Sequence, residues 1–377
     1  KDGAVAAFRE LLQDCCRNDA DNFVSHCGEF ESLLFQQSDC WTAYLRRAVM
    51  ESENVCIRNW ASGAVTAVQE ECLNRELVFL DRLSQVTLDD LTAGLDHAPD
   101  FLVGWRMEGG SIAQDYRQRM QEVGEKGYGI FARYHMFTVE NGQLVPVKHP
   151  DPQQLKQLPG YEQERQKVIA NTQALLDGKP ANNVLLYGDA GTGKSSAIKA
   201  IANNFAEQGL RLVEVKKNQL YQIPDLMDAL AANPLKFILF IDDLSFTSND
   251  DNFAALKAIL EGSVGGRAQN IAVYATSNRR HLIKETMTDR NGDDIHESDT
   301  RQELMSLSAR FGLTVTFASP DRDRYLYIVG ELAKQYGVDL DEHTLAVRSE
   351  AFAIRMGGRS ARVAKQFIEL CKSGVQV

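Results

Sequence analysis

The sequence lacks the two features that would direct the chain to a membrane. No apolar run approaches the roughly 18 to 20 residues that a transmembrane helix needs. A secretory signal, with its charged and then apolar segments, is also absent, although the chain begins at Lys1 instead of a methionine. These absences predict a cytoplasmic protein with no membrane partner.

The cysteines form no recognisable framework of disulfides or metal ligands. The chain has seven of them, an odd number, and six lie within its first 72 residues. No two are spaced as a C-x-x-C pair, which is the commonest element of zinc and redox sites. We therefore predict free thiols buried on helices.

The sequence also has fewer basic than acidic residues. The chain has 41 Lys and Arg against 52 Asp and Glu, for a formal net charge of -11 and a pI near 5.2. Such a surface does not attract nucleic acid as a whole, although a local basic patch stays open. With 44% hydrophobic and 25% charged residues, the composition is that of a soluble globular protein of two or three domains.

The first third of the chain has helical periodicity and no chemical motif. Apolar residues recur at helical spacing, as in "AVAAFRELLQDCC". We predict a mainly helical accessory domain over residues 1–127, which binds an unknown protein partner. Residues 128–160 then combine a β-hairpin around Asn141-Gly142, a strong turn signal, with a proline-rich linker.

From Tyr161 onward, apolar strand patterns alternate with helical patterns. The predicted strands are 183–187, 211–215, 236–241, 271–277 and 313–317. Such alternation predicts an α/β core over residues 161–319, with a parallel sheet and helices on both faces. The last segment, residues 320–377, has the pattern of three helices, which we interpret as a helical lid.

The strongest chemical motif follows the first strand of this core. "YGDAGTGKSS" contains G-x-x-x-x-G-K-S between a predicted strand and a predicted helix. Backbone N–H groups of such a loop surround phosphate oxygens at the positive end of a helix. Lys194 would reach the β- and γ-phosphates, and the Ser195 hydroxyl would bind Mg²⁺. The predicted nucleotide-binding residues are Gly188, Asp189, Ala190, Gly191, Thr192, Gly193, Lys194, Ser195 and Ser196.

Two adjacent acids end another predicted strand. In "FILFIDDLSF" an apolar run stops at Asp242 and Asp243. In P-loop proteins an acid at this point binds Mg²⁺ together with the serine, so Asp242 is the second predicted metal ligand. We predict that Asp243 activates the attacking water. The alternative, that Asp243 only caps the next helix, stays open.

Further polar residues would complete a catalytic site. Asn278 ends "YATSN", where it would position the water or simply form a turn. Arg310 ends a predicted helix in "SARFGL" and is either a surface charge or a group that reaches a neighbouring subunit's γ-phosphate. Arg359, in "MGGRSARVAKQFIE", is predicted to approach the γ-phosphate, with Arg362 as the alternative.

Together these motifs resemble those of the AAA+ ATPases. Residues 188–195 resemble Walker A, 238–243 Walker B, Asn278 sensor 1, Arg310 the arginine finger and Arg359 sensor 2. The resemblance implies an AAA+ P-loop core with strand order 5-1-4-3-2 and the cofactors ATP and Mg²⁺. It also implies a homo-oligomeric ring, such as a hexamer, with ATP at the subunit interfaces. ATP is preferred over GTP on this resemblance alone.

A narrower resemblance concerns "FIDDLSF", "DTRQELMSLSARFGL" and "GGRSARVAKQF". These segments are similar to an uncharacterised bacterial family of predicted ATPases, number 815 among the domains of unknown function, over the hairpin and the N-terminal helical region as well. One departure is that AAA+ proteins usually have Asp-Glu where this chain has Asp-Asp, as in replication initiators. The shorter carboxylate falls about 1 Å back, a misplacement that can slow a reaction strongly. We therefore predict slow ATP hydrolysis, coupled to assembly or to partner remodelling.

Two other functions stay open from the sequence. One is a nucleotide-gated switch or loader that contacts nucleic acid through Arg106, Arg117, Arg119, Arg279 and Arg280, although these arginines are scattered along the chain. The other is a scaffold protein with a vestigial site, against which the intact phosphate-binding motif argues.

Overall fold

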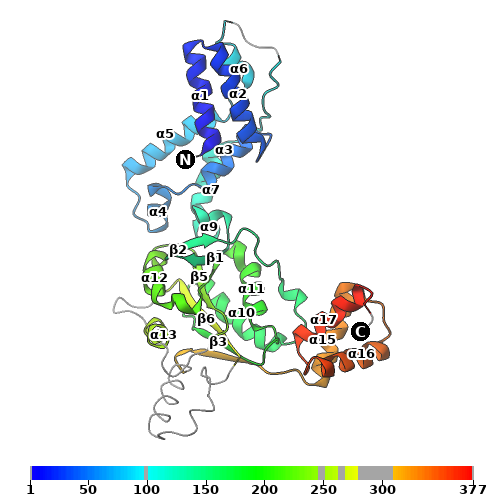
Figure 1. The fold of residues 1–377 in the computed structure, drawn as a ribbon. Coiled ribbons are helices and arrows are strands. Elements are labelled where there is room, and N and C mark those ends of the chain that lie inside the picture. Colours follow the sequence, from blue (N-terminus) through cyan, green and yellow to red (C-terminus); the bar gives the residue numbers. More distant parts are fainter. Residues whose placement is uncertain (1, 97–100, 245–250, 262–267, 279–308, 376–377) are drawn as a thin grey trace. The chain divides into compact units, whose positions relative to one another are not determined.

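The structure is a computed structural model, and it describes residues 2–96, 101–244, 251–261, 268–278 and 309–375 (Figure 1). The chain divides into two compact units, Lys1–Arg133 and Tyr134–Val377. Each unit has a hydrophobic core of its own. Among the described helices, none combines the length and the hydropathy that crossing a membrane requires.

The first unit is helical throughout its described elements, as its periodicity predicts. Its helices are α1 (Gly3–Arg17), α2 (Ala20–Phe35), α3 (Trp41–Met50), α4 (Val55–Ala61), α5 (Ala67–Leu83), α6 (Leu88–Thr92), α7 (Ile112–Gln121), α8 (Val123–Lys126) and α9 (Ile130–Arg133). Aromatic rings fill the core, where Phe8 stacks on Trp41 at 4.5 Å between centroids and Phe30 meets Trp41 edge-on at 5.2 Å.

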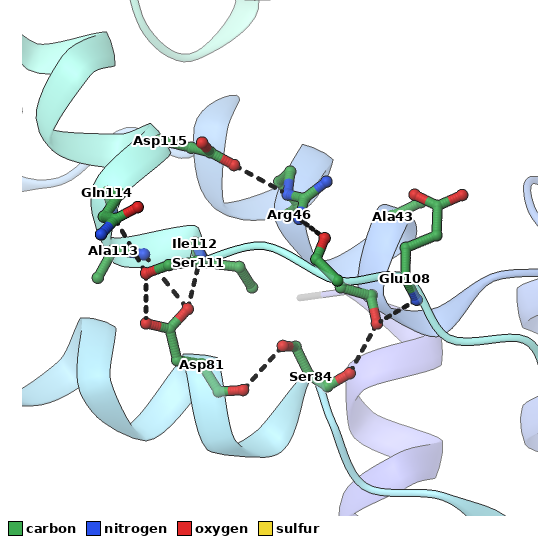
Figure 2. A network of polar contacts seen from close by, with 12 residues as sticks. Ala43, Arg46, Asp81, Ser84, Glu108, Ser111, Ile112, Ala113, Gln114 and Asp115 are labelled. Atoms are coloured by element: carbon green, nitrogen blue, oxygen red, sulfur yellow. Dashed lines mark hydrogen bonds and ion pairs between the residues drawn. The ribbon is translucent and has the colours of Figure 1, made fainter.

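A polar network joins the C-terminal end of α5 to the beginning of α7 (Figure 2). The Asp81 carboxylate accepts hydrogen bonds from Ser111 Oγ at 2.8 Å and from the Ile112 backbone N–H at 2.5 Å. The Ser84 hydroxyl donates to the backbone carbonyl of Asp81 at 2.8 Å. The first N–H groups of a helix have no partner within that helix. A side chain of α5 therefore caps α7 and fixes the two helices to each other.

The seven cysteines are all free, as predicted. Their burial is more varied than predicted, because Cys27 and Cys40 are buried whereas Cys16 and Cys72 are exposed. Within the described residues, no group of three or more His, Cys, Asp and Glu is arranged to hold a metal ion.

The second unit is built on a seven-stranded sheet with the order β2-β1-β4-β5-β6-β3-β7. The strands are β1 (Met136–Glu140), β2 (Gln143–Pro146), β3 (Val184–Gly188), β4 (Leu210–Glu214), β5 (Lys236–Ile241), β6 (Ile271–Ser277) and β7 (Leu313–Phe317). The pair β1–β2 is antiparallel, and every other described pair is parallel. Counted from β3, the core strands have the order 5-1-4-3-2, so this prediction is confirmed.

The predicted hairpin at Asn141-Gly142 is also confirmed, and it belongs to the core sheet. Both turn residues have positive φ, 51° and 76°, as a tight two-residue turn requires. Strand β1 pairs in parallel with β4, with Met136 opposite Leu212. The hairpin therefore adds two strands to one edge of the five-stranded core.

Helices surround this sheet and form the lid. They are α10 (Glu162–Leu176), α11 (Lys194–Phe205), α12 (Ile223–Ala231), α13 (Asp251–Glu261), and the lid helices α15 (Arg322–Tyr336), α16 (Glu342–Arg355) and α17 (Ala361–Lys372). From Phe237 to Ile241, every residue of β5 is buried, which is the pattern of a strand covered on both faces. Lid residues such as Tyr325 and Phe367 share one hydrophobic cluster with the strands.

Candidate functional site

A cavity of about 1150 Å³ lies in the second unit. Its walls are the loop between β3 and α11, the ends of β5 and β6, the linker before α10, and the lid helices α15 and α17. Ligands of open α/β sheets bind at this edge, outside the carboxyl ends of the strands. The volume is large enough for a nucleotide.

The loop after β3 forms the floor of the cavity, which residues 190–196 line. Gly188 and Asp189 precede these residues in the loop and do not line the cavity. At Gly188 a Cβ atom would lie 2.0 Å from the carbonyl oxygen of Phe317, so only glycine allows β3 to pass this close to β7. Hydrogen bonds from Ser319, first from its side chain and then from its backbone N–H at 2.7 Å, lower the pKa of the Asp189 carboxylate. The loop is thus anchored to the chain beyond β7.

Lys194 lies at the centre of the site, with only 6% of its surface exposed. Its ammonium group donates hydrogen bonds to Gly188 O at 2.8 Å, Asp189 O at 2.7 Å and Asn278 Oδ1 at 2.9 Å. Burial lowers the pKa of Lys194, and the neighbouring carboxylates act against that shift. The three acceptors hold a cation between the loop and the end of β6.

Two oxygen-bearing side chains from separate elements lie close together in the site. Ser195 is at the start of α11, and Asp242 directly follows β5. Ser195 Oγ donates a hydrogen bond to Asp242 Oδ1 at 2.6 Å. Mg²⁺ prefers oxygen ligands and is commonly bound by one or two carboxylates together with substrate phosphates. A hydroxyl and a carboxylate beside a phosphate-binding loop therefore fit magnesium.

Asp243 lies next to Asp242 and also lines the cavity. Its φ of 51° is in the left-handed region, which is uncommon for a residue other than glycine. Asn278 Nδ2 donates to Asp243 Oδ1 at 2.8 Å, while Asn278 Oδ1 accepts from Lys194. The next described helix, α13, begins at Asp251, so Asp243 does not cap it.

The structure brings one of the two candidate lid arginines to the cavity. Arg362, in the first turn of α17, lines the cavity, and its backbone N–H donates to Gly191 O at 2.9 Å. Arg359 is not among the lining residues, because both ends of its guanidinium bind the Glu350 carboxylate at 2.8 and 2.7 Å. Of the two, Arg362 therefore lines the cavity, whereas the sequence favoured Arg359, and the approach of either arginine to a γ-phosphate stays a prediction.

Arg310 also lies outside the lining of this cavity. It is partly buried and directly precedes the segment that leads into β7. Its predicted role at the γ-phosphate of a neighbouring subunit stays a prediction.

Thr276 is a residue of the site that the sequence reasoning missed. It lines the cavity, its hydroxyl donates to Asp242 Oδ1 at 2.5 Å, and it accepts from the Asp243 backbone N–H at 2.9 Å. Alternation along a strand puts positions 276 and 278 on the same side, and that signal could have identified it. Lining residues from the linker and the lid were missed as well, and they include Pro159, Tyr161, Ile328, Leu332 and Ala361.

Three of the arginines proposed to contact nucleic acid lie in the described part of the first unit. Arg106, Arg117 and Arg119 each donate a hydrogen bond to an acceptor within the first unit. Arg279 and Arg280 lie outside the described residues.

The strand order, the glycine-rich loop after β3 and the C-terminal helices form the α/β fold that the resemblance to AAA+ proteins predicts. The chain belongs to the family described as "Protein of unknown function (DUF815)", whose model matches residues 131–375. The match includes the hairpin and nearly all of the second unit. The expectation that it also includes the N-terminal helical region is wrong, because α1 to α8 lie before residue 131 and the match begins within α9.

Among solved structures, the chain is similar to a lysine-to-arginine mutant of RuvB from Thermotoga maritima. The two are 18% identical, with a TM-score of 0.38, over 58% of this chain and 64% of that one. The chain thus spans a little under two thirds of the length of this relative.

Proposed function

We propose that the protein binds ATP with Mg²⁺ and hydrolyses it slowly to ADP and phosphate, and that its nucleotide state controls assembly or the remodelling of a partner. The observation that carries this proposal is the connected set of polar groups in the cavity. Lys194, Asn278 and Asp243 form one hydrogen-bonded chain, and Ser195 and Asp242 form a pair beside it.

The phosphates of ATP would lie on the loop before α11. Backbone N–H groups and the N-terminal end of a 12-residue helix favour an anion there. Lys194 would exchange its carbonyl and amide acceptors for phosphate oxygens, and Arg362 would approach from the lid. The base would lie towards the linker and lid, where Ile328 and Leu332 offer apolar surface.

Ser195 and Asp242 would hold Mg²⁺. When bound, the ion neutralises phosphate charge and orients the phosphate chain. The Asp242 carboxylate is held in position for this role, because its Oδ1 accepts hydrogen bonds from the hydroxyl groups of Ser195 and Thr276.

Asp243 would accept the proton of the attacking water. In the reaction the water oxygen bonds to the γ-phosphorus, the bond to the bridging oxygen breaks, and ADP leaves. Asn278 would keep the Asp243 carboxylate in place through its 2.8 Å hydrogen bond. Since aspartate is shorter than the usual glutamate, the carboxylate reaches less far and turnover is slow.

The partners belong to the proposal as well. Arg310 would act on the γ-phosphate of a neighbouring copy in a homo-oligomeric ring, since it does not line its own subunit's cavity. The first unit would bind a protein partner. Exposed apolar side chains on α5 support this, because Val68 and Phe79 are 73% and 61% exposed and lie three helical turns apart on one face.

Purified protein should hydrolyse ATP only when Mg²⁺ is present, with a turnover number below about 1 s⁻¹, at the low end of the range for enzymes. The measurement is phosphate release with ATP and with GTP, in Mg²⁺ and in EDTA, together with calorimetric titration of each nucleotide. Absence of nucleotide binding by calorimetry would refute the proposal.

Arg362→Ala should weaken ATP binding about tenfold, because it removes a charge-assisted contact to phosphate. Arg359→Ala should change ATP affinity less than about twofold and should instead lower the melting temperature, because it breaks the bidentate pair with Glu350. Calorimetric titration and thermal unfolding of both variants separate the two effects. Equal losses of affinity would mean that Arg359 also reaches the nucleotide.

A further inference from the structure

Asp243 lies just beyond the end of β5, where the hydrogen bonding to β6 shifts by one residue. In the regular part of the pair, Phe237 lies opposite Ile271 and its N–H donates to Asn270 O at 2.8 Å. Six residues further along both strands, the same spacing would join the N–H of Asp243 to the carbonyl of Thr276. The structure instead joins the N–H of Leu244 to Thr276 O, at 2.7 Å. One residue has been added on the β5 side, as in a β-bulge, just beyond the last paired residues Ile241 and Ala275, and we call this shift the bulge.

The bulge explains how two consecutive acids can face one cavity. Successive side chains of a regular strand point to opposite sides of the sheet. Here Asp242 contacts Ser195 and Asp243 contacts Asn278, and both acids line the cavity. The left-handed backbone of Asp243, with φ of 51°, turns the second side chain to the same side as the first.

The hydroxyl of Thr276 occupies the position that the bulge leaves open. It accepts the Asp243 N–H at 2.9 Å, in place of the carbonyl that a regular pair would offer, and it donates to Asp242 Oδ1 at 2.5 Å. Thr276 is only 2% exposed, so water is a poor substitute for either bond. A hydroxyl can donate and accept at once, whereas a side chain of the same shape without oxygen can do neither.

We propose that Thr276 is the positioning residue for both acids. Its hydroxyl holds the Asp242 carboxylate against Ser195 and fixes the backbone of Asp243, so that the second carboxylate reaches Asn278. Thr276 touches neither the γ-phosphate nor the attacking water in this assignment, and it acts through the two aspartates. The inference rests on the proposed ATP hydrolysis and adds a specific residue to it.

Thr276→Val tests this assignment, since valine keeps the shape of threonine and lacks the hydroxyl. We expect kcat for ATP hydrolysis to fall about 10- to 100-fold while KM for ATP rises by no more than about tenfold, because the acids move and the phosphate-binding loop does not. Thr276→Ser should recover most of the lost turnover. Thr276→Ala removes the same hydroxyl without a replacement methyl group and provides a second variant should valine prevent folding.

Thr172→Val is the matched control. Thr172 is also buried in the second unit, and its hydroxyl bonds to Val168 O at 2.9 Å and Tyr274 Oη at 2.8 Å, but it does not line the cavity. It should lose stability without losing turnover. Thermal unfolding of each variant shows whether a loss of activity follows a loss of fold.

A binding measurement provides a readout apart from turnover. A fluorescent ATP analogue is titrated in EDTA and in Mg²⁺, and the gain in affinity on adding Mg²⁺ should be at least about threefold smaller in Thr276→Val than in the wild type. Affinity in EDTA should be unchanged. Turnover within twofold of the wild type in a folded Thr276→Val or Thr276→Ala protein would overturn the inference, as would an equal loss in Thr172→Val.

The same experiment separates the inference from the proposed function. If the wild type does not hydrolyse ATP, the proposed function fails, and the Mg²⁺-dependent gain in affinity then decides whether Thr276 positions Asp242. If the wild type hydrolyses ATP and Thr276→Val does so equally well, the proposed function stands and the assignment of Thr276 falls.

Discussion

Lys194→Met should abolish measurable ATP turnover, a loss of at least about 100-fold, and weaken ATP binding by a similar factor. The ammonium group is buried and is held by Gly188, Asp189 and Asn278, so it is a fixed cation at the loop where the phosphates are proposed to lie. A factor of 100 corresponds to about 2.7 kcal/mol of lost stabilisation. Methionine fills the same space with an apolar chain of similar length, so the site keeps its packing and loses its charge. Phosphate release and calorimetric titration measure the two effects.

Lys199→Met is the matched control for that variant. Lys199 is on the same helix, is more exposed, and faces Glu214 at 3.9 Å, outside the lining of the cavity. Its replacement should leave both turnover and affinity within about twofold of the wild type, as is usual for surface substitutions. Turnover that persists in Lys194→Met would exclude the phosphate-binding loop as the site of hydrolysis.

Asp243→Asn should reduce turnover about 100-fold or more while ATP affinity stays the same or increases. The amide oxygen can still accept the hydrogen bond that Asn278 gives to Asp243, so the geometry survives, but it cannot take a proton from water. Binding should not suffer, because removing a negative charge near the triphosphate relieves repulsion. Single-turnover kinetics with the measured affinity distinguish the chemical step from binding.

The control for Asp243→Asn is Asp228→Asn, which makes the same change on the exposed surface of α12. It should leave turnover and affinity as they are in the wild type. A parallel loss of affinity and turnover in Asp243→Asn would contradict the assignment, because it would make Asp243 a binding group instead of the base.

The elements of the α/β core could be predicted because their signals are local. The apolar run of β5 and the glycine-rich loop before α11 can each be recognised from about ten residues of sequence. The predicted bounds of the five core strands lie within one residue of those observed. The pairing of β1 with β4 could not be predicted in this way. It joins segments about 75 residues apart, and packing in three dimensions decides such a pairing.

The same distinction explains which site residues were found. Lys194 and Ser195 follow from a motif whose spacing fixes their geometry, and Asp242 follows from a second local signal, an acid at the end of an apolar strand. The choice between Arg359 and Arg362 depends on how the lid docks, because one arginine precedes the cap of α17 and the other lies in its first turn. No glycine in the sequence indicates the bulge at Asp243. The left-handed backbone there, and the role that we propose for Thr276 in supporting it, could therefore be recognised only in the structure.

The parallel pairing of β1 with β4 also bears on how an isolated ATPase core should be cut from this chain. A fragment that starts at Tyr161 would remove β1 and leave the backbone N–H and C=O groups along one side of β4 open to solvent and to other chains. Such an open edge promotes aggregation through new strand pairing. A fragment that starts at Tyr134 keeps the edge covered by a hairpin whose outer strand is only four residues long and ends in Pro146, both of which discourage further pairing.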